Sequence, residues 1–128
     1  IQIIAAVLGT LFANYIFGLN VIEFSSNIRS GANIYISEIF AATGLLLVIL
    51  LSRADGKNVV SFNVGIYITA ALIFTSSTSF ANPAVTIARM FTESFTGINP
   101  STVIFFISCQ VIGMFAAYNL YNQFFKSK

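Results

Sequence analysis

The sequence predicts an all-α membrane protein with four transmembrane helices and one re-entrant half-helix. Its 128 residues are 57% hydrophobic and 8% charged, a balance typical of a chain surrounded by lipid. Four long apolar segments alternate with short polar connectors. The third segment lies within a run from Asn58 to Ala88 that carries no charge, and the pair Asn82-Pro83 follows it in the same run. We therefore expect a helix that begins within the membrane.

Four segments have the length and apolar character of a membrane span. A single intramembrane charge, Glu38, lies in the second of them. No linker or low-complexity stretch divides the chain, so we predict one transmembrane domain over residues 1–128. The four predicted spans are Ile1 to Leu19, Ile34 to Ser52, Val59 to Thr75 and Thr102 to Phe125.

The re-entrant element is predicted from the pair Asn82-Pro83. Asparagine is a strong N-cap residue and proline is favoured at the first helical position, so this pair indicates a helix start. From Asn82 to Met90 a helix rises about 12 Å, or about half of the ~30 Å hydrocarbon core. Its N-terminal N–H groups and positive dipole end would face a passing solute.

Charges on the connectors predict the orientation of the chain. Arg53 and Lys57 lie between the second and third spans, and two further lysines, Lys126 and Lys128, follow the fourth. Both places should be cytoplasmic under the positive-inside rule, which puts the loop around Arg29 outside. The chain starts at Ile1 and not at methionine. A cleaved signal peptide could explain this start, but we expect truncation of a longer chain.

The apolar spans and the Asn82-Pro83-Ala84 motif resemble those of the major intrinsic protein family, the aquaporins and aquaglyceroporins. The resemblance covers the whole chain and implies the C-terminal part of a family member, with the half-helix over about residues 82–92. It implies a multi-pass protein of the cell membrane, either inner or plasma, with a cytoplasmic C-terminus, and a homotetramer in the lipid bilayer. The first two spans and the first Asn-Pro-Ala motif of the family have no counterpart here. Asn-Pro-Ala-Val-Thr is more familiar at that first motif, but the basic tail favours the second.

The resemblance also implies a pore. Asn82 would donate its amide N–H₂ to the oxygen of a passing water or polyol. The backbone from Thr78 to Ala81, which includes Ser79 and Phe80, cannot be helical as it approaches Asn82. Its carbonyls would therefore line the pore as acceptors, since irregular backbone at membrane depth is tolerated where it faces a cavity.

A wide selectivity constriction is implied by three further positions. Water-selective relatives commonly have arginine directly after the motif, where this chain has Val85, and histidine where it has Ala70. Ser79 occupies the third position. Small, uncharged walls of this kind would admit larger neutral solutes than a strict water filter.

The residues from Asn82 to Ile98 look like those of bacterial aquaglyceroporin relatives that are associated with arsenic resistance. This resemblance implies a passive channel for water and small neutral solutes, including glycerol-like polyols and neutral metalloid species. The alternative is a non-conducting membrane scaffold, or a truncated remnant of a channel. A coupled transporter is a more distant alternative.

Two charged residues, Arg89 after the motif and Glu38 in the second span, allow more than one interpretation. Arg89 lies one turn beyond Val85 and could replace the absent filter arginine, but we favour a place in the outer vestibule, where Glu93 at i+4 could pair with it. Glu38 could serve a proton relay. By the resemblance we favour a structural role, in which Glu38 accepts hydrogen bonds from the re-entrant backbone.

The composition gives no support for catalysis or for a cofactor. The chain has no histidine, no metal-ligand spacing and no phosphate-binding loop, and its six basic residues form no nucleic-acid patch. We therefore predict that it is not an enzyme. The single cysteine, Cys109, is expected to be a buried packing thiol. Small residues recur at i+4 in the first and last spans and predict close helix contacts: Ala5, Gly9 and Ala13, and Cys109, Gly113 and Ala117.

Overall fold

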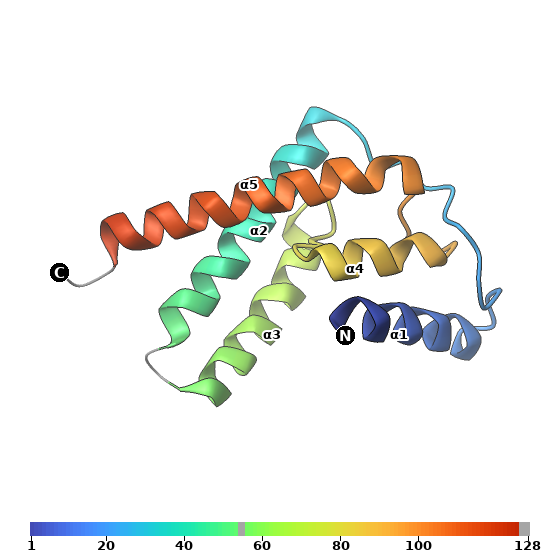
Figure 1. The fold of residues 1–128 in the computed structure, drawn as a ribbon, viewed down its shortest axis with the longest axis horizontal. Coiled ribbons are helices and arrows are strands. Elements are labelled where there is room, and N and C mark those ends of the chain that lie inside the picture. Colours follow the sequence, from blue (N-terminus) through green and yellow to red (C-terminus); the bar gives the residue numbers. More distant parts are fainter. Residues whose placement is uncertain (54–55, 126–128) are drawn as a thin grey trace.

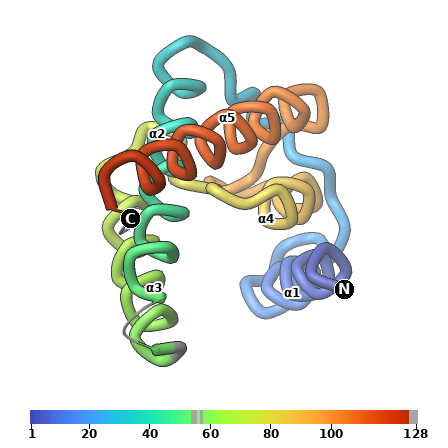
Figure 2. Tube along the Cα trace, turned by 60° about the vertical axis from the view of Figure 1, so that its left-hand side comes forward, coloured from blue at the N-terminus to red at the C-terminus, as the bar shows by residue number. Residues whose placement is uncertain are grey.

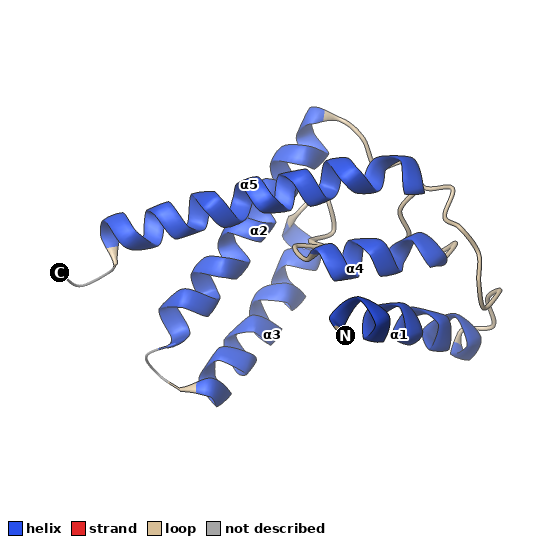
Figure 3. Ribbon diagram, in the orientation of Figure 1, coloured by secondary structure: helices blue, strands red, loops and turns tan. Residues whose placement is uncertain are grey.

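A computed structural model describes residues 1–53 and 56–125, and the regular elements in this part are all helices (Figure 3). The predicted cytoplasmic charges at Lys126 and Lys128, and the side chain of Lys57, lie outside what is described. A 3₁₀ turn, η2 (Arg89–Phe91), follows the fourth helix. The five α-helices are α1 (Gln2–Ile16), α2 (Ala32–Ser52), α3 (Lys57–Phe74), α4 (Pro83–Ala88) and α5 (Pro100–Phe124).

The short helix α4 lies between α1 and α5, while α2 and α3 form the other side of the fold (Figures 1 and 2). The most extensive helix contact joins α2 to α5, and α3 packs beside α2. The central position of α4 therefore depends on helices from both ends of the chain.

Two helices begin at the same local signal, an asparagine followed by proline. Asn82 caps α4 by accepting the N–H of Ala84, and Asn99 caps α5 by accepting the N–H of Ser101 at 3.0 Å. Proline at the first helical position needs no intrahelical acceptor for its nitrogen. The fourth apolar segment therefore becomes helical two residues earlier than predicted.

Small residues allow α5 to approach α2 closely. Cys109, Gly113 and Ala117 are all buried, and a Cβ atom on Gly113 would lie 2.6 Å from the carbonyl oxygen of Ile39. This contact and the burial of Cys109 confirm the predicted packing stripe on the last helix. The matching prediction for the first helix is not confirmed, because a Cβ atom on Gly9 would meet nothing within 4 Å among the described residues.

Length and hydropathy distinguish the described helices. Two of them, α2 and α5, are long and apolar enough to cross a membrane, with 21 and 25 residues. The apolar helix α1 has 15 residues, which corresponds to about 22 Å of helix. Many large apolar side chains on α1 and α3 are exposed, including Phe12, Tyr15, Phe62 and Ile73.

The buried apolar cluster lies beside α4. It contains Phe80, Ile98, Val103 and Phe106, and Phe80 and Phe106 pack with their ring centroids 5.2 Å apart. Because Phe80 lies just before α4, this cluster positions the backbone that leads into the helix.

Candidate functional site

Asn82 organises the first turn of α4. Its backbone is extended, with φ −150° and ψ 125°, and its Oδ1 accepts the N–H of Ala84 at 2.8 Å. Its carbonyl oxygen accepts the N–H of Thr86 at 3.0 Å. Among the described residues, none accepts a hydrogen bond from Nδ2 of Asn82. The cap therefore uses the acceptor end of the amide and leaves both donor hydrogens for another molecule.

The backbone before Asn82, Thr78 to Ala81, is held in an unusual conformation. We call these four residues the descending segment. Thr78, Ser79 and Ala81 have φ values of 60°, 44° and 51°. L-residues rarely occupy this left-handed region, so the surrounding structure must supply the contacts that hold it.

Hydrogen bonding in the descending segment is one-sided. Its four N–H groups all have acceptors: the carbonyl of Thr75, Oγ of Ser77 and the two carboxylate oxygens of Glu38. None of its four carbonyl oxygens accepts a hydrogen bond from the described residues. Ser79, Phe80 and Ala81 are buried, and a buried carbonyl without a partner needs a polar ligand or water, because unpaired polar groups are costly away from water. The segment thus offers a row of free acceptors.

Glu38, on α2, holds the descending segment. Its carboxylate is fully buried, and Oε1 accepts the N–H of Ala81 at 2.6 Å while Oε2 accepts the N–H of Phe80 at 3.3 Å. Oε1 also accepts a hydrogen bond from Nε2 of Gln110 at 2.8 Å. Within the described residues, the carboxylate thus accepts hydrogen bonds from two backbone N–H groups and one side-chain amide. These contacts are those expected of a structural role.

Gln110 is absent from the sequence predictions, and it links three elements of the site. Its Nε2 lies on α5 and donates both to Glu38 on α2 and to Oγ1 of Thr86 on α4, the latter at 2.7 Å. Thr86 Oγ1 in turn donates to the carbonyl of Asn82 at 3.0 Å. Gln110 and Thr86 are both fully buried. A glutamine inside an apolar span was the available signal, since a buried amide needs partners.

A pocket of about 360 Å³ opens beside the Asn-Pro-Ala motif. Ala81, Asn82 and Pro83 line it on one side, and Gln2 of α1 and Leu46 of α2 line it on others. The motif therefore faces a space large enough for several water molecules. Of the descending segment, Ala81 lines this space, so a ligand here would meet Asn82 and the end of the row of carbonyls next to it.

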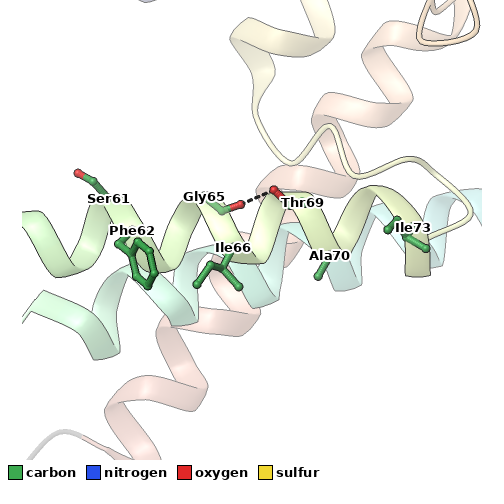
Figure 4. A pocket seen from close by; sticks show the side chains of 7 residues that line it. All are labelled: Ser61, Phe62, Gly65, Ile66, Thr69, Ala70 and Ile73. Carbon is green, nitrogen blue, oxygen red and sulfur yellow. Dashed lines mark hydrogen bonds between the residues drawn. The ribbon is translucent and has the colours of Figure 1, made fainter.

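The three predicted constriction residues have different surroundings. Ala70 is exposed and lies in an open groove of about 620 Å³ along α3, where Phe62, Ile66 and Ile73 lie on the same side of the helix (Figure 4). Val85 is half-buried against the apolar cluster, and Ser79 is buried with no hydrogen-bond partner for its Oγ among the described residues. The groove around Ala70 does not include Ser79 or Val85.

Arg89 lies at the end of α4 and stacks on Phe80. Its guanidinium carbon is 4.3 Å from the ring centroid. The side chain lines a pocket of about 470 Å³ between α1 and the residues after α4, which we call the outer pocket. The half-buried guanidinium does not extend freely towards the surface, because Nη1 is shielded from solvent.

The predicted pairing of Arg89 with Glu93 is wrong. α4 ends at Ala88, and η2 and the extended residue Thr92 follow, so the helical spacing that brings i and i+4 together is lost. Glu93 instead accepts hydrogen bonds from the N–H and the hydroxyl of Ser26, the latter at 2.7 Å. These two donors lower the pKa of Glu93 below its ordinary value.

Arg29 fastens the loop between α1 and α2 to the residues around the site. It donates to the carbonyl oxygens of Gly97 at 2.8 Å, Phe95 at 2.7 Å and Ser77 at 3.3 Å. Burial lowers the pKa of Arg29, and the charge of Glu38 partly opposes this shift. The sequence identifies Arg29 only as a charged residue in a loop. Its contacts are with residues 48 to 68 positions away, and no local sequence pattern predicts such contacts.

No cluster of three or more His, Cys, Asp or Glu side chains that could hold a metal ion occurs in residues 1–53 and 56–125. The polar groups that converge on Asn82 are amides, hydroxyls and carbonyls. They are suited to hydrogen bonding with neutral molecules.

The chain is similar to a curated membrane channel protein. Over 116 residues, the chain is 41% identical to the aquaglyceroporin AqpS of Rhizobium meliloti (strain 1021). The match covers 91% of this chain and 50% of the relative, so the chain spans about half the length of the curated protein that it matches. No family model matches the chain. No solved structure matches it.

Proposed function

We propose that this chain, a partial member of the major intrinsic protein family by its homology to an aquaglyceroporin, forms part of a passive channel for water and small neutral solutes. The family consists of channels and not of enzymes. The observation that carries the proposal is the asymmetry of the descending segment. Its N–H groups are all bonded within the protein, its four carbonyl oxygens accept no bond from the described residues, and it ends at the free amide donor of Asn82.

This arrangement suits a hydroxyl-bearing solute. A water molecule or a polyol is both donor and acceptor, so it can donate to the row of carbonyls and accept from Nδ2 of Asn82. Replacing the hydration shell with fixed groups of this kind is how a pore lowers the barrier for a chosen solute. Neutral solutes need no compensating charge within the pore.

Selectivity for larger neutral solutes is proposed from the residues Ala70, Ser79 and Val85. None of them is charged, and Val85 stands where a strict water filter has arginine. The relative is described as an aquaglyceroporin, which supports glycerol-like polyols as the solute class. By the resemblance, neutral metalloid species with several hydroxyl groups belong to the same class. Ala70 and Val85 have separate surroundings in this chain, so the proposed constriction requires additional helices to complete its wall.

We propose that α1, α2, α3 and α5 cross the bilayer and that α4 with η2 is the re-entrant element. The exposed apolar side chains of α1 and α3 are suited to contact with lipid or with helices of other chains. The basic connector and tail would lie on the cytoplasmic side of the cell membrane. A homotetramer is proposed from the family resemblance.

The proposal is tested by stopped-flow light scattering on proteoliposomes that contain the purified chain. Vesicles are first challenged with an impermeant osmolyte to measure water flow, and then with glycerol to measure solute uptake. Permeability to both above that of empty vesicles is expected. Permeability equal to that of empty vesicles, with insertion verified by protease protection, would contradict conduction by this chain.

A non-conducting scaffold is the second candidate, and one observation favours it. The groove along α3 that contains Ala70 is open on one side and apolar, so it can pack against another membrane helix without forming a pore (Figure 4). The same vesicle assay separates the two candidates, since a scaffold adds no permeability.

A further inference from the structure

The outer pocket combines one cation with several hydroxyl groups. It occupies about 470 Å³ between α1 and the residues that follow α4. Its polar lining consists of Thr10, Asn14, Arg89, Thr92, Ser94 and Thr96, and the rest of its lining is apolar. No acidic side chain of the described residues lines it. The pocket therefore presents positive charge and hydrogen-bond donors.

Arg89 has no partner within the part of the chain that the structure describes. Its guanidinium makes no hydrogen bond and no ion pair there, and Nη1 is shielded from solvent. The ring of Phe80 gives it a favourable contact that satisfies none of its N–H donors. Arginine that is removed from water is normally paired with a carboxylate or phosphate, which its planar donors match in shape.

The charge of Glu38 compensates the positive charge of Arg89 only in part, because the like charge of Arg29 acts on it more strongly. The guanidinium carbon of Arg29 lies 5.0 Å from the centroid of the same Phe80 ring, and Arg29 donates to neutral carbonyls. The nearby acids are engaged elsewhere, since Glu93 binds Ser26 and Glu38 binds the descending segment. Two guanidinium groups near one ring thus create a region of positive potential.

Hydroxyl groups complete the pocket on the side of the loop. Oγ1 of Thr92 lies 3.1 Å from Oγ of Ser94, which lies 3.1 Å from Oγ1 of Thr96. Hydroxyl hydrogens rotate, so these three side chains can turn one or more donors towards a ligand oxygen.

We propose that the outer pocket binds a small oxyanion, with Arg89 as the charged contact and the hydroxyls of Thr92, Ser94 and Thr96 as additional donors. An oxyanion supplies the two things that the pocket lacks, a negative charge and acceptor oxygens. A neutral polyol supplies acceptors but leaves the charge of Arg89 unpaired. The site goes beyond the proposed channel function and does not depend on conduction, because occupancy can be measured without any flux.

The test is isothermal titration calorimetry with inorganic phosphate on the intact chain in nanodiscs of zwitterionic lipid, at pH 7 and low salt. Saturable binding of phosphate is expected, weakened by added sodium chloride, with glycerol giving no saturable signal at the same concentrations. Arg89→Gln removes the charge and keeps most of the side-chain length. It should weaken phosphate binding by about tenfold or more, as expected for loss of a charge-assisted hydrogen bond.

Two further variants keep the test decisive. Arg53→Gln removes the same charge from an exposed position at the end of α2, and phosphate affinity should stay unchanged. Ala13→Leu fills the outer pocket from α1 without altering Arg89, and it should abolish binding even if Arg89→Gln does not fold. The proposal is overturned if wild type shows no saturable binding, or if Ala13→Leu binds phosphate as tightly as wild type. Glycerol permeability of proteoliposomes made from the same purified proteins reports separately on the proposed channel.

Discussion

Oε1 of Glu38 accepts the backbone N–H of Ala81 at 2.6 Å, which ties the N-terminal half of α2 to the residue directly before the Asn-Pro-Ala motif. The contact spans 43 positions in sequence. Ala81 has a φ of 51°, a conformation that its own side chain disfavours, so an external acceptor is needed to hold it. The carboxylate therefore keeps the N–H groups of Phe80 and Ala81 turned towards the protein, while the carbonyl oxygens of the descending segment accept no hydrogen bond from the described residues.

Glu38→Gln should destabilise the protein. The amide keeps the size of the carboxylate but loses the charge and presents donor hydrogens to the N–H groups of Phe80 and Ala81. The expected loss is about 3 kcal/mol of unfolding free energy, the magnitude for a buried group whose charged hydrogen-bond partner is removed. Thermal unfolding in detergent, followed by circular dichroism, measures it. Glu23→Gln, in the loop between α1 and α2, is the matched control and should unfold like wild type.

Gly113→Ala should weaken the contact between α5 and α2. A Cβ atom at this position would lie 2.6 Å from the carbonyl oxygen of Ile39 and 2.9 Å from Cβ of Ala42, so the helices must separate. Overpacking of this kind costs about 1–3 kcal/mol. Gly9→Ala is the control, because the new methyl group meets nothing within 4 Å and alanine favours the helix. Equal melting temperatures for the two variants would contradict the packing described for α5.

Stability should fall at low pH in part through Glu93. The hydroxyl and N–H of Ser26 lower the pKa of this carboxylate below its ordinary value of 4.5. The stabilisation is therefore complete above that ordinary value and is lost as the pH falls through the lower pKa of the folded protein. Glu93→Gln should flatten the acid end of a plot of melting temperature against pH. Identical curves for the variant and wild type would show that the Ser26 contact does not form.

Val85→Arg should narrow the proposed constriction. A guanidinium at this position adds bulk and donors where the wild type has a half-buried aliphatic side chain. Glycerol permeability of proteoliposomes should fall more than water permeability. Val85→Leu keeps the position apolar and should retain glycerol permeability. If Val85→Arg inserts normally and conducts glycerol like wild type, Val85 does not line the solute path.

Local signals explain which parts of this structure could be predicted. The helix start at Asn82-Pro83 depends on a capping side chain and a fixed φ, both encoded in two adjacent residues, and α4 begins there. The same signal at Asn99-Pro100 was available and shows why α5 starts before the apolar run. The long apolar segments predicted helices because hydropathy and length are themselves local properties.

Long-range contacts explain what could not be predicted. The bonds of Gln110 to Glu38 and Thr86 join α2, α4 and α5, and sequence spacing alone does not bring them together. The predicted pair of Arg89 and Glu93 required a continuous helix, and the change to a 3₁₀ turn after Ala88 removed that geometry. The constriction positions were assigned by their spacing from Asn82, following the motif of a known family. Spacing along the sequence does not determine which helices surround each position.

The role of Asn82 can be separated into capping and solute contact. Aspartate is as good an N-cap as asparagine, so Asn82→Asp should retain the stability of wild type, whereas Asn82→Ala should lose about 1 kcal/mol. Aspartate has no N–H₂ group to donate and adds a negative charge beside the carbonyls of the descending segment. Asn82→Asp should therefore remain folded and lose solute binding in the pore. Thermal unfolding of both variants checks the first half of this prediction.

The glycerol permeability of proteoliposomes that contain Asn82→Asp, compared with wild type at equal protein content and equal melting temperature, tests most directly whether solutes pass along Asn82 and the descending segment. We expect rapid glycerol uptake for wild type and uptake close to that of empty vesicles for the variant, because the amide donor next to the carbonyl oxygens of the descending segment is gone. Equal glycerol permeability for a folded Asn82→Asp and wild type would contradict this solute path.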